Sequence, residues 1–236
     1  MQDKNQSNLQ HMDNINNTTK KLPPVYKAVW AVGILKPKFN PNGAVFANQL
    51  DVIGTAVWLK TEKVLITCAH VVQNLLGAPL ELTGLLVVGQ NGNYIPAKIG
   101  VIDLMHDLAV LKIDNQEIAN QQTEGLEISE TYHAVGTKIG YAGFPLGMQL
   151  LQERHAPTYN EGLIGSEIKN LGIRKEIQIS GAVTGGYSGS PIVALDNPEK
   201  IIGIVSNSPS KEAGDANIFM GISWEHIKAL ATVPVS

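Results

Sequence analysis

The sequence predicts an all-β fold, a barrel or a sandwich, with one helix at its C-terminus. Short apolar segments rich in β-branched residues follow one another about ten to twenty residues apart, separated by turn residues. Only the segment SWEHIKALA has helical spacing, because Trp224, Ile227 and Leu230 fall on one face and Ser223 can act as N-cap. Many short strands with a single helix are typical of all-β architectures.

Composition excludes several classes of protein. The 236 residues carry a formal net charge of -3, so the basic patch typical of nucleic-acid binding is not expected. The sequence has no run of apolar residues long enough to cross a membrane, and its N-terminus has no secretory signal. Cys68 is the only cysteine, which rules out an internal disulfide and predicts a reducing cytoplasm.

The segments follow in order along the chain. Residues 1–24 are predicted to be a disordered tail, because they are polar and have too few apolar residues to form a core. We expect strands at 26–35, 54–60 and 63–72, a loop at 36–43, and a hairpin over 84–103 with its tip at 91–93. Further strands are expected at 107–114, 138–145, 176–181, 190–195 and 201–206.

Three short segments carry residues suited to nucleophilic catalysis. TCAHVV contains His70, HDLAVLKID contains Asp107, and GYSGSP contains Ser188. Each alone is ordinary: a partly buried histidine, an acid at the start of a strand, a glycine-rich turn. Together they supply what a hydroxyl nucleophile needs, namely a base, a carboxylate to orient that base, and glycine-assisted backbone N–H donors for an oxyanion.

In this order, His, Asp and Ser, the segments resemble the signature motifs of the chymotrypsin-like serine proteases. The bacterial branch that includes HtrA-type and glutamyl-endopeptidase-like enzymes is most similar. GTAVWL at 54–59, GYAGFPLG at 140–147 and IIGIVSNS at 201–208 extend the resemblance over residues 27–232. The resemblance implies two six-stranded antiparallel β-barrels within a protease domain at 25–236. Barrel 1 would span about 25–120, barrel 2 about 121–222 and the C-terminal helix about 223–232.

The resemblance also implies roles for single residues. Ser188 would be the nucleophile and His70 the general base, later the general acid, while Asp107 would orient His70. The backbone N–H groups of Gly186 and Ser188 would form the oxyanion hole. Ser190 is expected to be a tolerated small residue in the same turn, and Asp103 is the rival acid. The chemistry calls for no cofactor, and we expect no metal site.

The specificity pocket is expected to be uncharged. Ala182, six residues before Ser188, takes the place of the pocket floor, and Ser206, Asn207 and Ser208 take the place of one wall. This predicts cleavage of peptide or protein substrates after a small or medium uncharged residue. Cleavage after glutamate is the alternative, with His133 or Thr184 contributing.

Activation is expected to differ from that of trypsin-like zymogens. Tyr187 stands where those zymogens have the aspartate that pairs with a newly freed N-terminus. The resemblance therefore implies an enzyme that folds directly into its active form, or one that a protein partner activates by reshaping the oxyanion turn. We expect no PDZ domain, because the C-terminal helix is followed only by TVPVS.

Two other interpretations stay open. In an α/β-hydrolase the triad order is Ser, acid, His, and Asp215 and His226 do follow Ser188, although Ser190 replaces the last glycine of G-x-S-x-G. The second is a barrel of this fold that binds partners and has lost proteolysis. Surface or structural roles are expected for His106, His133, His155 and His226, and Cys68 is expected to be a small core residue.

Overall fold

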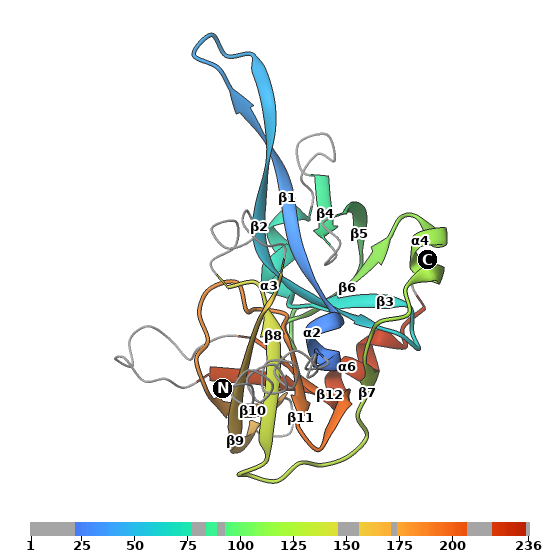
Figure 1. Cartoon of the computed structure of the whole chain (residues 1–236), viewed down its shortest axis with the longest axis vertical. Coiled ribbons are helices and arrows are strands. Elements are labelled where there is room, and N and C mark those ends of the chain that lie inside the picture. Colours follow the sequence, from blue (N-terminus) through green and yellow to red (C-terminus); the bar gives the residue numbers. More distant parts are fainter. Residues whose placement is uncertain are drawn as a thin grey trace, which may run out of the picture.

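The chain folds into two β-barrels that pack against each other (Figure 1). The structure, a computed structural model, describes residues 22–76, 84–88, 93–145, 156–170, 174–206 and 219–234. Most of the predicted tail at 1–24 therefore lies outside the described residues, as do Asn207 and Ser208. Each barrel is closed by six antiparallel strands, so the predicted fold class is confirmed.

The first barrel is closed by pairing between its first and fourth strands in the chain. In spatial order its strands are β1 (Val29–Phe39), β2 (Val45–Leu59), β3 (Val64–Thr67), β6 (Leu108–Ile113), β5 (Tyr94–Asp103) and β4 (Gly84–Val88). Strands β3 and β6 are buried along nearly their whole length, which explains why both read as unbroken apolar runs in the sequence.

The second barrel closes through the pairing of β11 with β12. In spatial order its strands are β11 (Pro191–Ala194), β8 (Lys138–Gly143), β9 (Thr158–Asn170), β10 (Arg174–Ser180), β13 (Phe219–Ser223) and β12 (Asn197–Val205). A short seventh strand, β7 (Glu127–Ile128), adds to β12 in parallel. Strand β7 comes at the end of the segment that connects β6 of the first barrel to the second barrel.

The C-terminal helix joins the two barrels. Helix α6 (Trp224–Ala231) packs against β3 and β6 of the first barrel and against β12 and β13 of the second. Ile227, Leu230 and Ala231 form its buried face. The predicted helix is therefore present, and it covers the junction of the two barrels (Figure 1). Ser223 precedes it, but its hydroxyl contacts the carboxylate of Glu225 instead of capping a backbone N–H.

The predicted loop at 36–43 is wrong for its first half and confirmed for residues 40–43. Strand β1 continues to Phe39 and pairs with β2 from Val45, so the two strands form a long hairpin that projects from the body (Figure 1). A Pro at position 37 is tolerated there, because beyond the barrel wall the hairpin strand needs no second neighbour. The side chain of Asn40 closes the tip by accepting from the N–H groups of Asn42 and Ala44.

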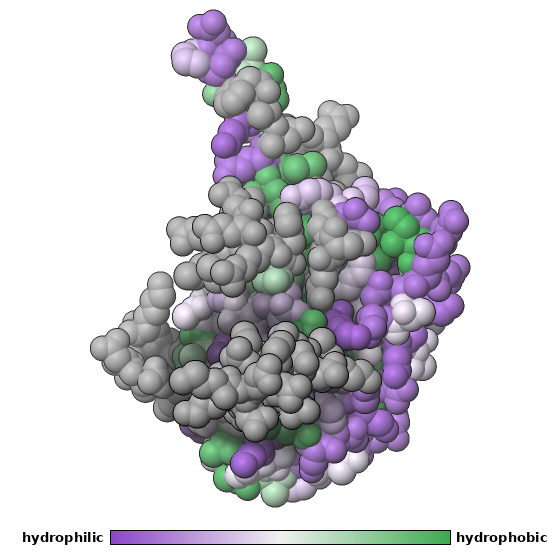
Figure 2. Space-filling model, in the orientation of Figure 1, coloured by the Kyte–Doolittle hydropathy of each residue, from purple (hydrophilic) through white to green (hydrophobic). Residues whose placement is uncertain are grey.

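The projecting end of this hairpin carries two exposed apolar residues. Phe39 and Val45 are paired in register, and their exposed fractions are 61% and 56%. Elsewhere the described surface on the face shown in Figure 2 is mainly hydrophilic, with separate apolar spots. Large apolar residues are also exposed elsewhere, for example Met105 at 66% and Leu104 at 62%.

The predicted strand at 63–72 is only partly right. Strand β3 ends at Thr67, and the next residues form the short helix α3 (Ala69–Val72), followed by a 3-10 turn (Gln73–Leu75). An apolar run by itself does not distinguish a strand from a helical turn, and the sequence contained no breaker at this point. His70 therefore lies on a helical turn and not at a strand end.

Other elements were not predicted. Strands β9 and β13 were missed because β9 is polar and alternates weakly, and β13 has only five residues. The helices α2 (Pro24–Lys27) and α4 (Gln116–Gln121) are too short for helical spacing to show; Asn115 caps α4 with its side chain. The described helices are all too short to span a bilayer.

Candidate active site

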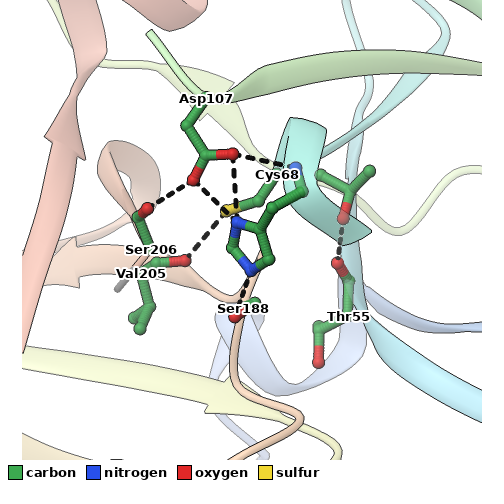
Figure 3. A network of polar contacts seen from close by, with 8 residues as sticks. Thr55, Cys68, Asp107, Ser188, Val205 and Ser206 are labelled. Atoms are coloured by element: carbon green, nitrogen blue, oxygen red, sulfur yellow. Dashed lines mark hydrogen bonds and ion pairs between the residues drawn. The ribbon is translucent and has the colours of Figure 1, made fainter. Parts of the chain in front are cut away.

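Three polar side chains meet between the two barrels. His70 lies on α3 and Asp107 ends the turn between β5 and β6, both in the first barrel. Ser188 belongs to the turn between β10 and β11 in the second barrel. Figure 3 shows the three side chains pointing toward one another. We call residues 103–107 the acid turn and residues 185–190 the nucleophile turn.

The distances are those of a hydrogen-bonded chain. His70 Nε2 lies 2.9 Å from Ser188 Oγ. His70 Nδ1 lies 2.8 Å from Oδ2 and 3.0 Å from Oδ1 of Asp107. Because a carboxylate only accepts, the proton of a neutral His70 belongs on Nδ1, and the lone pair on Nε2 is free to accept from the serine hydroxyl. The ring is therefore held in the tautomer that a general base needs.

Asp107 is held from several sides. Its Oδ1 accepts from the backbone N–H of His70 at 2.9 Å, and its Oδ2 accepts from Ser206 Oγ at 2.5 Å. Burial by itself would raise the pKa of Asp107. The hydrogen bonds from His70 and Ser206 outweigh it, so the pKa lies below its ordinary value of 3.8. Asp107 is thus ionised at neutral pH although only 15% of its side chain is exposed.

The backbone of Asp107 is unusual. Its φ is 57°, in the left-handed region that non-glycine residues rarely adopt. Its carbonyl accepts from the N–H of Ala69, which places the acid turn directly beside α3. The conformation costs energy, and such residues persist where the surrounding contacts enforce it.

The nucleophile turn depends on two glycines. Gly186 and Gly189 have φ values of 99° and 91°. A Cβ added at Gly189 would lie 1.8 Å from the carbonyl oxygen of Thr55, and one added at Gly186 would lie 2.2 Å from that of Phe144. No side chain fits at either position, so this turn requires glycine for both backbone conformation and space.

Thr55 on β2 fastens the nucleophile turn to the first barrel. Its backbone N–H donates to the carbonyl of Ser188 at 2.9 Å, and its Oγ1 donates to the carbonyl of Gly186 at 2.8 Å. The same Oγ1 accepts from the N–H of Phe144, and the carbonyl of Thr55 accepts from Thr67 Oγ1 (Figure 3). Sequence reasoning missed this residue; the only signal was its position in the segment GTAVWL.

The two predicted oxyanion donors lie in this fastened segment. Thr55 binds the carbonyls of Gly186 and Ser188, so it contacts the backbone of the same two residues. Neither the N–H of Gly186 nor that of Ser188 donates to an acceptor within the described part of the chain.

Ser190 follows two residues later and is fully buried. Its backbone N–H donates to Tyr187 and its carbonyl accepts from Val205. Its Oγ has no hydrogen-bond partner among the described residues. The residue fills a tight space, since a Cβ on Gly143 would lie 2.0 Å from this oxygen.

The predicted pocket residues differ in exposure, and two of them lie outside the described residues. Ala182 is exposed, and its carbonyl accepts from Tyr141 Oη at 3.0 Å. Ser206 is 5% exposed and its hydroxyl is directed at Asp107, a role that the sequence did not predict. Asn207 and Ser208 lie outside the described residues. Thr184 is exposed, and His133 lines a small cavity next to Trp224 at the start of α6.

Tyr187 occupies the position next to the nucleophile. Its ring is 2% exposed and meets the ring of Tyr141 edge-on, with 5.7 Å between centroids. Burial raises the pKa of Tyr187 to about 12, with the neighbouring Tyr141 adding to the effect. The side chain is therefore neutral, and its hydroxyl contacts Asn160 instead of an amino group.

Cys68 lies directly behind the imidazole (Figure 3). Its thiol is fully buried and donates to the carbonyl of Val205 at 3.3 Å. One donor atom each from Cys68, His70 and Asp107 lie within 4.8 Å of one another. His70 and Asp107 also use these atoms in hydrogen bonds, His70 with Asp107 and Asp107 with Ser206.

The rival residues lie elsewhere. Asp103 binds His106, not His70. His226, the candidate base of an α/β-hydrolase triad, lies on α6, where its Nε2 accepts from the backbone N–H of Lys175. Asp215 and His155 are outside the described residues. The all-β architecture, together with the place of His226, excludes the α/β-hydrolase interpretation.

A known protein family and several known proteins are similar to this chain. Residues 54–204 match the family model described as trypsin-like peptidase domain. Among curated proteins, the pro-apoptotic serine protease NMA111 of Eremothecium gossypii is 26% identical over 175 residues, covering 55% of this chain and 17% of that protein. NMA111 of Phaeosphaeria nodorum is 30% identical over 102 residues, covering 40% and 9%. The chain thus spans less than a fifth of these fungal relatives.

Solved structures show the same fold. The HtrA-type protease AlgW with a decapeptide superposes with a TM-score of 0.66 at 21% identity, covering 91% of this chain and 65% of that one. A variant of that protease with a tripeptide gives a TM-score of 0.62 at 22% identity, covering 88% and 61%.

Proposed function

The chain belongs to the trypsin-like peptidase family of serine proteases, and on this premise we propose that it is an endopeptidase that works through Ser188, His70 and Asp107. Ser188 is the nucleophile, His70 the general base and then the general acid, and Asp107 orients His70. The backbone N–H groups of Gly186 and Ser188 bind the oxyanion.

One observation carries this proposal. A single imidazole lies 2.9 Å from a serine hydroxyl through Nε2 and 2.8 Å from a carboxylate through Nδ1. The three groups come from segments far apart in the chain. Nothing in a structural role requires a base, an ionised acid and a hydroxyl in this sequence of contacts.

The reaction follows from the geometry. Ser188 Oγ attacks the carbonyl carbon of the scissile peptide while its proton passes to His70 Nε2. The carbonyl electron pair moves onto oxygen, which receives hydrogen bonds from the two N–H groups. Collapse of this intermediate expels the amine, which takes the proton from His70, and an acyl-enzyme remains. Water then gives a proton to His70 and attacks the acyl carbon, and Ser188 leaves with that proton.

The barrel interface is what aligns these groups. The base and the acid come from the first barrel, and the nucleophile comes from the second. Thr55 links the two through its hydrogen bonds to Ser188 and Gly186. Accurate placement of this kind is a large part of catalysis, because a displacement of about 1 Å can cost about 10²-fold in rate.

Peptides are the proposed substrate class, with cleavage after a small or medium uncharged residue. Ala182 brings no charge to the place of the pocket floor, which disfavours Lys or Arg in the substrate. His133 does not favour the glutamate alternative, because it borders a cavity beside Trp224 and not the nucleophile turn. Digestion of a peptide library identifies the preference, and dominant cleavage after Arg or Lys would contradict this part of the proposal.

A reducing compartment remains part of the proposal. The only cysteine, Cys68, is a buried free thiol, so the fold needs no oxidising environment. Direct activity of the folded chain and activation by a protein partner differ in one measurable respect. An enzyme that needs a partner reacts with a fluorophosphonate only slowly until a cell extract from its source is added.

The triad is tested with Ser188→Ala and a matched control in the same turn. We expect Ser188→Ala to abolish fluorophosphonate labelling and to lower kcat by about 10⁴-fold or more. Ser190→Ala removes a hydroxyl without a described partner and should keep both labelling and hydrolysis. If folded wild-type protein is never labelled, with or without extract, the alternative of a binding module that has lost proteolysis is correct.

A further inference from the structure

Two imidazole rings stack where the acid turn meets the C-terminal helix. His106, the residue directly before Asp107, and His226 on α6 have ring centroids 4.0 Å apart and planes inclined by 22°. Helix α6 also packs against β12 and β13, which are strands of the second barrel. The stack therefore ties the turn that carries the catalytic acid to an element shared by both barrels.

The His106 side of the stack is fixed by Asp103. The carboxylate of Asp103 accepts from the backbone N–H groups of Met105 and His106 at 3.0 and 3.1 Å. Its other oxygen lies 2.6 Å from His106 Nδ1. Burial would raise the pKa of Asp103, but these hydrogen bonds from His106 and Met105 lower it below 3.8. The acid thus stays charged and holds the ring of His106 within the turn.

The His226 side is fixed by β10. Nε2 of His226 accepts from the backbone N–H of Lys175 at 2.9 Å, so this nitrogen must carry a lone pair. On the same helix, Glu225 forms an ion pair with Lys175 Nζ at 2.8 Å. His226 is therefore in the neutral form in this arrangement, with its ring clamped between β10 and the acid turn.

The groups that face His226 change its pKa in opposite directions. Burial lowers its pKa below the ordinary value of 6.5, and His106 and Lys175 lower it further, while Glu225 and Asp103 oppose this change. A proton on Nε2 would oppose the N–H of Lys175 with a second donor. It would also place a positive charge beside His106. Acid should therefore break the contact between the helix and the turn.

We propose that His106 and His226 are positioning residues that hold Asp107 in its strained backbone conformation, and that protonation of His226 releases the acid turn and lowers peptide hydrolysis. The inference rests on the proposed function of Asp107. Its φ of 57° needs enforcement from outside, and His106 is the neighbouring residue through which α6 acts on it.

The pH dependence of the enzyme tests this. In the wild type, log(kcat/KM) should fall on the acid side with a slope greater than one over about one pH unit, because protonation of His226 adds a roughly tenfold loss to the ionisation of the general base. His226→Gln keeps an oxygen that accepts from Lys175 but cannot titrate, so its slope should return to roughly one. His226→Ala should lower kcat about tenfold with KM nearly unchanged, since the acid is misplaced and the pocket is not.

A control separates positioning from loss of stability. Lys228→Met removes the ion pair between the same helix and Glu130, away from the acid turn. It should destabilise α6 slightly and leave the slope and kcat unchanged. If His226→Ala and Lys228→Met behave alike, or if His226→Gln keeps the wild-type slope, the inference is wrong.

A readout without substrate separates this inference from the proposed function. The proton between His70 Nδ1 and Asp107 gives a far-downfield NMR resonance when that hydrogen bond is intact. It should weaken as His226 titrates in the wild type and persist to lower pH in His226→Gln. If that pattern appears in a protein that fluorophosphonate does not label, the positioning role of His226 is supported and the proposed function is contradicted. If the resonance behaves alike in the wild type and in His226→Gln, the positioning role of His226 is contradicted, whatever the activity.

Discussion

The acid turn and the nucleophile turn achieve the same end by different means. Each contains backbone with positive φ, at Asp107 in one and at Gly186 and Gly189, on either side of Ser188, in the other. The acid turn has a non-glycine residue at this position and enforces it with charged and polar side chains. The nucleophile turn uses glycines and is fastened by hydrogen bonds from Thr55.

The difference teaches what each turn is sensitive to. Charges and ring nitrogens hold the acid turn, so changes of pH and of hydrogen-bonding groups should affect it. Close backbone contacts hold the nucleophile turn, so added volume should affect it. Four substitutions test this contrast, beginning with the largest expected effect.

Asp107→Asn should break the acid turn's function with almost no change of shape. The amide would place donors where the carboxylate now accepts from His70 and Ser206, and His70 would be driven to the other tautomer. We expect kcat to fall by about 10⁴-fold. Steady-state kinetics measure this, and Asp103→Asn in the same turn should cost far less. Equal losses for the two variants would mean that Asp107 is not the catalytic acid.

Gly189→Ala should distort the nucleophile turn, because the added methyl group has no space there. Its Cβ would lie 1.8 Å from the carbonyl of Thr55, so the backbone that carries Ser188 must move. We expect unfolding to need roughly 3–5 kcal/mol less free energy. Activity in the folded fraction should fall about 10²–10³-fold as the oxyanion donors shift. Urea unfolding and kinetics measure both.

Gly136→Ala is the matched control for that variant. Gly136 has a similar φ of 88°, but a Cβ there meets nothing within 4 Å. It should cost only the backbone strain of about 1–2 kcal/mol and leave activity intact. If Gly189→Ala is no worse than this control, space is not what the nucleophile turn requires.

Thr55→Val should loosen the nucleophile turn without adding volume. It removes the donor to the carbonyl of Gly186 and leaves the buried N–H of Phe144 without an acceptor. We expect a loss of about 1–3 kcal/mol in the free energy of unfolding. A loss in kcat of about tenfold should accompany it, because the oxyanion donors are less well placed. Thr55→Ser restores the hydroxyl and should recover most of both; failure to do so would assign the effect to packing.

Ser206→Ala should have the smallest effect on rate and the clearest effect on pH dependence. Removing one donor to Asp107 raises the pKa of that carboxyl toward 3.8. A carboxylate with a lowered pKa in the folded state stabilises the fold above its unfolded pKa, and this stability is lost as pH falls through the folded value. The acid-unfolding midpoint should therefore move to higher pH, while kcat falls less than about tenfold.

Fluorescence followed through an acid titration measures that midpoint. Ser129→Ala is the control, because it removes a buried hydroxyl that accepts only from the N–H of Thr131. An unchanged midpoint in Ser206→Ala would show that Ser206 does not stabilise the charged form of Asp107.

Local patterns were sufficient for much of the architecture. Short apolar segments in β2, β6, β8 and β12 identified strands, and the spacing of Ile227 and Leu230 identified α6. Patterns were insufficient where an apolar run fits both a strand and a helix, as at 63–72, which ends in α3. They also failed at 36–39, where pairing with β2 makes a strand out of the segment KPKF.

The sequence by itself determined the residue types of the site and their order, because a base, a carboxylate and a serine between glycines are visible as local motifs. Their partners were decided only by the tertiary structure. Thr55, Ser206 and His226 lie 131, 99 and 51 residues from the groups they bind, and no local pattern records such contacts. The physical reason is that hydrogen bonds and ring stacking depend on positions in space, which are set when the two barrels close and α6 packs across them.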